Sequence, residues 1–287
     1  MGVRFWIILL MVGLTGCGKG QNPTTVNNLS NFVPRVGTVS SEEQAVILVE
    51  KLGGTVGWDD PKAGKPIIIE LTGTKVTDSE LKQIAQLKSL TTLFLASTKV
   101  TDSGLKEIAQ LTALASLSLR DTKVTDAGLT ELAPLNSLSV LDLGNTVLTD
   151  AGFKYLAALK GLTSLTLNGT KVTGSEFKDL AQLKWLTSLA LGDTGITDAS
   201  LTGLTNHSGL TMLYLHRTQV TDAGLKEIVK LKALTTLQLS FTQVTDAGLK
   251  ELARLKSLTN LDLTDTKVTD AGVAELQKTL PKCKIVR

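Results

Sequence analysis

The sequence predicts an α/β solenoid, a right-handed superhelix of β-α units that curves into a horseshoe arc. A parallel sheet is expected on the concave side of the arc and helices on its convex side. Three observations support this prediction. One is that each period of the sequence contains one strand-like and one helix-like pattern, and another is the period itself, which is 24 residues long. Threonine marks it nine times without an insertion, at positions 74, 98, 122, 146, 170, 194, 218, 242 and 266. The third is the composition, because 42% hydrophobic and 20% charged residues are typical of a folded chain.

One copy of the period, residues 90–111, shows both patterns. Leu93 and Leu95 alternate with other residues, as in a short strand with one buried face. Leu105, Ile108 and Leu111 then follow at spacings of three, which places them on one face of a helix. A single strand and helix cannot bury these faces alone, whereas stacked copies can, and this requirement predicts the solenoid.

Two polar rows repeat with the same period. We expect the hydroxyls of the nine threonines to point into the core and to bind loop backbone, because buried polar groups need partners. A second row, Thr101-Asp102 and its equivalents, is expected to cap the helices, and metal binding is the alternative interpretation. Glutamate is the third residue after this threonine in Thr77–Glu80 and Thr173–Glu176, where we expect complete capping boxes.

The pattern LxxLxLxxT resembles the leucine-rich repeat, with threonine where that family often has asparagine or cysteine. The resemblance covers residues 66–281, and these 24-residue copies are similar to the ribonuclease-inhibitor-like repeats found in bacterial lipoproteins. It implies a horseshoe fold that holds another protein on its concave sheet. It implies neither an enzymatic activity nor a cofactor.

The start of the chain resembles the signal of a bacterial lipoprotein. Residues 1–4 carry one positive charge, and residues 5–14, FWIILLMVGL, form an apolar run that is too short for an ordinary membrane-spanning helix. The run ends in LTGC, similar to a lipobox, which implies cleavage after residue 16 and acylation of Cys17. An ordinary cleaved signal and an uncleaved anchor are the alternatives. The resemblance implies a lipid-anchored, extracytoplasmic protein of the cell envelope, and Gly18 favours the outer membrane if the cell has two membranes.

The rest of the chain divides by composition. Residues 17–39 are polar and contain proline and glycine, as in a flexible tether. Residues 40–66 are expected to form an N-terminal cap, with a capping box at Ser40–Glu43 and strands at 55–60 and 67–69. Nine leucine-rich repeats follow over residues 67–281. Residues 282–287 are expected to form a C-terminal capping strand, with Cys283 as a buried free thiol.

Two clusters stand out among the residues that the pattern places on the concave face, which are otherwise small and polar. The main cluster combines six residues of two neighbouring strands: Met212, Tyr214, His216, Arg217, Gln238 and Phe241. A weaker cluster contains Phe94 and Arg120 together with Asp121 and Asp142. Tyrosine and arginine are enriched in interface hot spots, so we predict that both clusters bind a partner protein. Chance variation on a solvated sheet, in a structural envelope protein without a defined ligand, is the alternative.

Charge and residue counts exclude several other functions. A net charge of +3 argues against a dedicated nucleic-acid binder, and two histidines with two cysteines leave little for a metal site. Gly13–Lys19 fits the spacing of a phosphate-binding loop, but Gly20 stands where the magnesium-binding hydroxyl belongs. His216 with Asp193 and Ser240 suggests a hydrolase triad, yet an exposed sheet offers it no pocket. We therefore expect no enzymatic activity, no metal, no cofactor and no small-molecule substrate. Lysines on the outer helices alternate with acids and are expected to be solvated.

Overall fold

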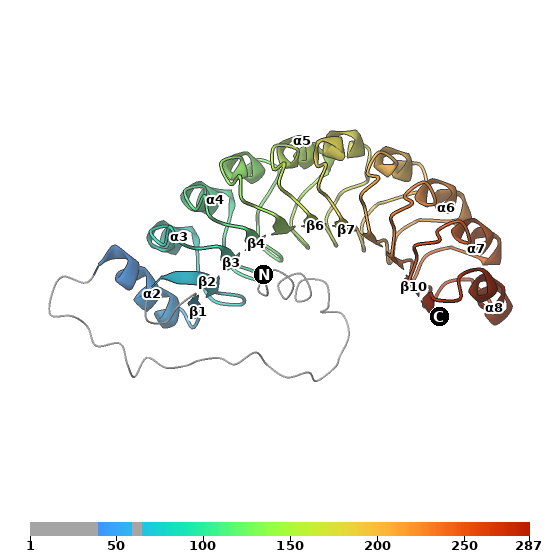
Figure 1. Ribbon diagram of the computed structural model, residues 1–287. Helices are drawn as coiled ribbons and strands as arrows, with labels where there is room; N and C mark the ends of the chain where they lie inside the picture. The colour runs from blue at the N-terminus through green and yellow to red at the C-terminus, as the bar shows by residue number, and fades with distance from the viewer. Residues whose placement is uncertain (1–39, 59–64) are drawn as a thin grey trace.

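The computed structural model describes residues 40–58 and 65–287, which form one curved arc. Strands lie along the concave side of this arc and helices along its convex side (Figure 1). The expected signal segment, Cys17 and the tether lie outside the described residues, so their assignment stays a prediction. The predicted α/β horseshoe is confirmed. None of the helices in the described ranges is long and apolar enough to cross a membrane.

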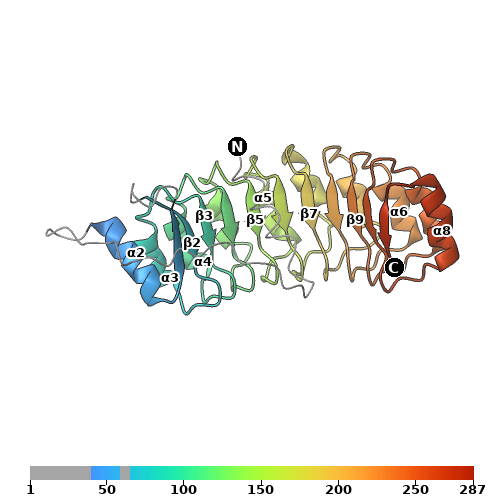
Figure 2. The same cartoon turned by 60° about the horizontal axis from the view of Figure 1, so that its bottom comes forward.

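The sheet contains eleven strands that lie side by side in chain order (Figure 2). The first two strands pair antiparallel and all later neighbours pair parallel. Each parallel pair matches residues that are 24 apart, such as Leu93 with Leu117 and Leu117 with Leu141. The strands are β1 Thr55–Trp58, β2 Pro66–Glu70, β3 Thr92–Phe94, β4 Ser116–Ser118, β5 Val140–Asp142, β6 Ser164–Thr166, β7 Ser188–Ala190, β8 Met212–Tyr214, β9 Thr236–Gln238, β10 Asn260–Asp262 and β11 Lys284–Val286.

The convex side has α-helices at both ends, and 3-10 helices together with the short α-helix α5 in the middle. The helix expected in every copy is present, but in the central copies it is wholly or partly a 3-10 helix. The α-helices are α2 Ser41–Lys51, α3 Asp78–Ile84, α4 Asp102–Ile108, α5 Phe153–Leu156, α6 Asp222–Ile228, α7 Asp246–Leu252 and α8 Asp270–Thr279. The 3-10 helices are η2 Gly128–Leu132, η3 Asp150–Gly152, η4 Phe177–Gln182 and η5 Ser200–Leu204.

Local sequence explains two of these 3-10 segments. Pro134 follows η2 closely, and a proline has no backbone N–H that could continue the hydrogen bonds of an α-helix. The η5 segment contains Thr202 and Gly203 and is followed by Thr205, all of which have low helix propensity. The repeat therefore tolerates a tighter, shorter helix wherever its apolar residues still reach the core.

The core is a continuous column of leucine, valine and isoleucine that runs through all copies. Two larger side chains, Phe153 and Phe177, stack within it at 5.4 Å between ring centroids. The predicted threonine row is confirmed: each of the nine hydroxyls donates to the carbonyl three residues earlier, as Thr98 does to Leu95 at 2.6 Å. Seven of the nine threonines are buried. The row satisfies polar groups inside the arc and has no catalytic arrangement.

The row of aspartates links successive repeats, whereas the sequence pattern predicted only that these residues cap their helices. Asp222 lies in the first turn of α6, and its carboxylate accepts from the backbone N–H of Thr245 at 2.8 Å and from its hydroxyl at 2.7 Å. Thr245 in turn caps α7, because its side chain accepts from the backbone N–H of Ala247 at 3.2 Å. The same bonds recur along the arc, so each aspartate holds the cap of the next helix.

One of the two predicted capping boxes in the repeats is wrong. The box at Thr77 and Glu80 is present, with the Thr77 N–H donating to the glutamate at 2.8 Å. Thr173 instead donates its hydroxyl and its N–H to Asp150 of the preceding repeat. Glu176 makes no capping bond and precedes η4. Contact between repeats thus takes priority over the local box.

Both ends of the arc are covered by elements that differ from the repeat. Helix α2 begins with the predicted capping box at Ser40 and Glu43, and it buries Ala45 and Val49 against the first copy. Strand β11 pairs with β10 and completes the sheet at the other end. Cys283 is a buried free thiol, as expected, and burial raises the pKa of this thiol.

Candidate functional site

The turn after each of the strands β2 to β10 contains one residue in the left-handed backbone region. This position is glycine at 73 and 169 and is otherwise occupied by small polar residues in most copies. The non-glycine members have φ between 53° and 58° and are Ser97, Asp121, Asn145, Asp193, Arg217, Phe241 and Asp265. Glycine, asparagine and aspartate tolerate this region, whereas bulky side chains rarely adopt it. Arg217 and Phe241 therefore occupy a backbone position that suits neither residue type.

These two side chains contact each other at the surface. The guanidinium of Arg217 lies over the ring of Phe241, 4.7 Å from its centroid, in a cation–π arrangement. Arg217 is 59% exposed and Phe241 is 45% exposed. Asp193 on the preceding turn pairs with Arg217 at 3.7 Å and with the Nε2 atom of His216 at 3.4 Å. The four residues form one connected polar and aromatic surface on the turns after β7, β8 and β9.

The rest of the main cluster is less exposed than a binding site requires. Tyr214 is only 7% exposed, and burial raises the pKa of its hydroxyl. This hydroxyl contacts the sulfur of Met212 at 3.5 Å, and Met212 itself is half-buried. Gln238 is half-buried beside Tyr214 on the adjoining strand. Tyr214 therefore supports the concave floor, and its replacement would change packing as well as the surface.

The weaker cluster lies at the other end of the concave face. Arg120 pairs with Asp121 through its Nε atom at 3.3 Å, and both side chains are partly exposed. Asp142 is buried, and this burial raises the pKa of its carboxyl despite an N–H bond from Gly144 at 2.9 Å. Ser118 also donates to Asp142, at 3.2 Å. Arg120 offers the exposed charge here, while Asp142 is part of the floor.

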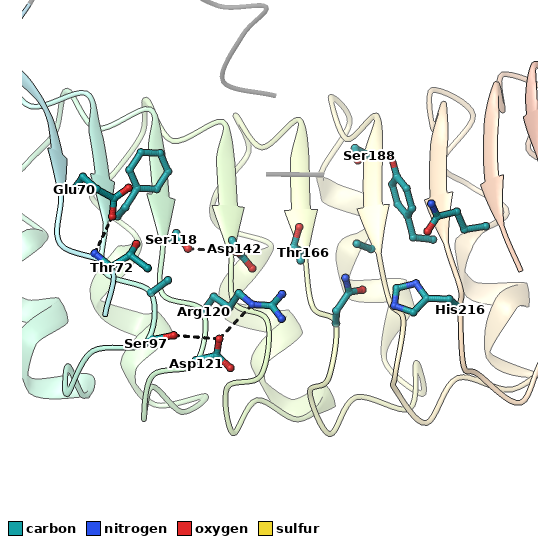
Figure 3. Close-up of a pocket in the computed structure, with 16 residues that line it drawn as sticks. Glu70, Thr72, Ser97, Ser118, Arg120, Asp121, Asp142, Thr166, Ser188 and His216 are labelled. Carbon is teal, nitrogen blue, oxygen red and sulfur yellow. Dashed lines mark hydrogen bonds and ion pairs between the residues drawn. The ribbon is translucent and has the colours of Figure 1, made fainter. Parts of the chain in front are cut away.

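A shallow hollow of about 430 Å³ connects the two clusters along the concave face (Figure 3). Arg120 lies towards one end of it and His216 towards the other. Phe94 and Tyr214 are also among the residues that line it. Small side chains form the floor between them, as Figure 3 shows for Ser118, Thr166 and Ser188. The sequence pattern indicates two separate clusters. In the structure, residues of both clusters line the same hollow on the concave face.

No hydrolase triad forms from His216, Asp193 and Ser240. In such a triad the histidine binds the carboxylate through one ring nitrogen and the nucleophile through the other. His216 contacts Asp193 through Nε2, but its Nδ1 atom is buried without a hydrogen-bond partner, and no bond joins it to Ser240. Within residues 40–58 and 65–287, no three histidine, cysteine or acidic side chains gather as a metal site.

Sequence reasoning missed two features. Asp193 is the residue that connects His216 to Arg217, although the prediction considered it only for catalysis. His207 stands at a position that Leu183 and Leu231 fill in the neighbouring copies. It is buried, its Nε2 atom has no partner, and burial, with a smaller effect of Lys184, lowers the pKa of its imidazole. The departure from the consensus was the available signal for His207, whereas Asp193 matches Asp121 and Asp265 at equivalent positions, so no such signal marked it.

Comparison with known proteins gives a consistent result. A family model described as a leucine-rich repeat region matches residues 69–286. The fold is similar to an internalin (inlF) from Listeria monocytogenes, with 28% identity and a TM-score of 0.59, and to internalin C2 from the same organism, with 27% identity and a TM-score of 0.55. These matches cover 72% and 74% of this chain, and 56% and 84% of the internalin chains. The chain thus spans just over half of the first internalin.

A leucine-rich-repeat protein from Leptospira interrogans shares the fold at a lower level of similarity. It is 24% identical to this chain, with a TM-score of 0.50, over 73% of this chain and 62% of that one. At this identity the similarity concerns the architecture alone. No curated protein matches the sequence.

Proposed function

The chain belongs to the leucine-rich-repeat family, and on that premise we propose that it is a non-enzymatic scaffold that binds another protein on the concave side of its arc. Proteins of this architecture generally serve as binding scaffolds, and their curved sheets form extended binding surfaces. The proposal places the partner across the turns after β7, β8 and β9 and the adjoining hollow.

The observation that carries the proposal is the backbone conformation of Arg217 and Phe241. A bulky residue in the left-handed region costs on the order of 1–3 kcal/mol, and such strain is concentrated at functional sites. Their mutual contact returns only about 0.5–1 kcal/mol, because a cation–π pair at an exposed site is weak. Stability alone would favour asparagine, aspartate or glycine, which six of the seven other copies have. A requirement for these side chains at the surface explains why they are kept.

The chemistry of this surface fits a protein partner. An exposed ring, an arginine and a histidine lie together with one carboxylate, and arginine and aromatic residues are enriched at protein interfaces. The exposed face of Phe241 offers an apolar contact, while the exposed guanidinium of Arg217 supplies donors for carboxylate or carbonyl groups. The alternative is a structural envelope protein that coats the surface without a defined ligand.

Site-specific crosslinking on intact cells distinguishes the two functions. A photoreactive residue at Gln238 on the concave face is expected to capture one protein selectively, as identified by mass spectrometry. The same group at Lys106, on the convex helix α4, serves as the control position. Capture of the same set of proteins from both positions would support the structural alternative.

A second variant tests whether crosslinking of the partner depends on Arg217 and Phe241. Replacing both Arg217 and Phe241 by asparagine suits the left-handed backbone, so the fold is expected to remain intact. We expect the crosslink from Gln238 to be lost in this variant, while circular dichroism and the melting temperature show a folded protein. Undiminished crosslinking in a folded variant would contradict the proposed site.

We further propose that the protein is anchored in the cell envelope through lipid on Cys17. The lipobox-like LTGC after the apolar run supports this location, and several acyl chains together hold a protein firmly to a bilayer. Wild-type protein is expected to enter the detergent phase on Triton X-114 partitioning, and the Cys17→Ser variant to stay in the aqueous phase. Equal partitioning of both proteins would show that acylation of Cys17 is not the anchor.

A further inference from the structure

The edge of the arc where the strands begin has an unusual charge. It is built from the nine segments that connect the helix of each copy to the next strand, from residues 84–92 to residues 276–284. In the sequence these segments contain ten basic residues and not one aspartate or glutamate. We call them the basic edge: Lys88, Lys160, Lys184, Lys230, Lys232, Arg254, Lys256, Lys278, Lys282 and Lys284. All ten are exposed.

The opposite edge, where the strands end, has the reverse balance. Its nine segments, from residues 72–80 to residues 264–272, contain thirteen acidic and seven basic residues. The strands share one direction from β2 to β11, so the two kinds of segment lie along the two long sides of the arc (Figure 2). A net charge of +3 for the whole chain therefore hides a strong separation of charge between its two edges.

Seven of the ten basic residues of the basic edge form no ion pair with the described residues. Lys230, Arg254 and Lys278 pair with glutamates on their own helices. Five further lysines share one repeat position, and none of them makes an ion pair with the described residues: Lys88, Lys160, Lys184, Lys232 and Lys256. Lys88 donates to an amide oxygen, that of Gln110, at 3.0 Å. Unpaired positive charges in a row attract an extended negative surface.

A large aromatic side chain projects from the middle of this edge. Trp185 directly follows Lys184 in the turn between η4 and β7, and it is 72% exposed. The equivalent position is serine, alanine, glycine or proline in the other copies. The two neighbouring copies have Gly161 and Gly209 there, so no side chain at this position covers the indole from either side. Neither packing nor the repeat pattern explains a tryptophan here.

We propose that the basic edge binds the surface of an anionic lipid bilayer, with Trp185 inserted at the level of the headgroups. Tryptophan prefers the membrane–water interface because its ring is apolar while its N–H remains hydrated. Lysines near an anionic bilayer each add to the attraction, which falls off within a Debye length. A nucleic acid strand would instead require several aromatic residues on which bases stack, and this edge has one.

This contact fixes how the arc lies on the membrane. With this edge on the bilayer, the strands begin at the lipid and run away from it, and the concave sheet faces sideways. The hollow and the Arg217–Phe241 surface then stay accessible to a partner. The inference concerns a different part of the molecule from the proposed binding site, and it does not depend on acylation of Cys17.

Fluorescence of Trp185 tests the contact directly. The full chain carries three tryptophans, so Trp6→Phe and Trp58→Phe leave Trp185 as the sole reporter, and Cys17→Ser removes the acylation site. We expect its emission to shift to the blue with vesicles that contain phosphatidylglycerol, and the shift to disappear at high salt. Phosphatidylcholine vesicles control for binding through the apolar segment at residues 5–14. An unchanged emission with anionic vesicles would overturn the proposal.

Charge variants distinguish an effect of the basic edge from an effect of the protein's net charge. The triple variant Lys160→Gln, Lys184→Gln and Lys232→Gln is expected to weaken partitioning to anionic vesicles on the order of 100-fold, or about fivefold for each lysine. The matched control, Lys106→Gln, Lys226→Gln and Lys250→Gln, removes the same charge from the convex helices. Equal losses in both variants would overturn the proposal. So would binding of a DNA duplex in the absence of any vesicle binding.

Discussion

Gly174 and Ser200 form a compensating pair in neighbouring repeats. Gly174 replaces the aspartate that other copies use to hold the next helix cap, and Ser200 replaces the glycine that other copies place beside that aspartate. The Ser200 hydroxyl accepts from the backbone N–H of Thr197 at 2.9 Å, a role that Asp198 has for Thr221 in the following pair. A Cβ on Gly174 would lie 2.7 Å from the Cβ of Ser200. The two positions therefore depend on each other.

The pair predicts a non-additive stability effect. Gly174→Asp alone should lower the free energy of unfolding by about 1–3 kcal/mol, because the side chain collides with Ser200 and Phe177. Ser200→Gly alone should lower it as well, because Thr197 loses its partner. The double variant removes the collision with Ser200 but keeps the left-handed backbone of residue 174 and the close approach of Phe177, so only part of the loss should be recovered. Urea denaturation of all four proteins gives the coupling energy, and strictly additive losses would refute the pairing.

The aspartate row predicts a local effect at Asp222. Replacing it by alanine leaves the Thr245 N–H and hydroxyl without their acceptor, which should cost about 1–3 kcal/mol. Faster hydrogen exchange at the Thr245 amide would locate the loss at this contact between repeats. Glu107→Ala, on the convex face of α4, is the control and should change stability little. A similar loss in both variants would mean that only net charge matters.

The left-handed turn predicts a substitution that stabilises the fold. Phe241→Asn should raise the free energy of unfolding by a few tenths to about 1 kcal/mol, since relief of about 1–2 kcal/mol of strain exceeds the lost ring contact. Phe94→Asn is the matched control, because Phe94 lies in β3 without a left-handed backbone and is half-buried. It should destabilise. Destabilisation by Phe241→Asn would show that the ring contributes more packing than its exposure indicates.

His207 predicts a loss of stability in mild acid. Burial lowers the pKa of its imidazole below the ordinary 6.5, so the unfolded chain binds a proton more readily than the folded one. The stabilising effect is complete above pH 6.5 and is lost as the pH falls from there through the lower folded pKa. His207→Leu, which restores the consensus, should flatten the change in melting temperature between pH 7.5 and 5.5. Persistence of the full change would assign it to other groups.

Much of the fold could be predicted because the same residue pattern recurs in every copy, so the same interactions form in every copy. Identical spacing of leucines gives every copy the same buried face, and only stacking satisfies nine such faces at once. The threonine row was predictable for the same reason, since each hydroxyl bonds three residues back within its own copy, as Thr98 does to Leu95. Interactions between copies were harder to predict, because the sequence does not show which side chains meet 23 or 24 residues apart. The bond from Thr173 to Asp150 is the clearest example.

The proposed binding surface could also be predicted only in part from the sequence. The sequence alone identified Arg217 and Phe241 as departures from a bland concave face, and it placed both at equivalent positions of adjacent copies. Only the tertiary structure shows that the backbone there is left-handed, that Asp193 connects His216 to Arg217, and that Tyr214 belongs to the floor. The physical reason is that a periodic pattern determines which face a residue occupies. Exposure, strain and pairing depend on how neighbouring copies pack against that residue.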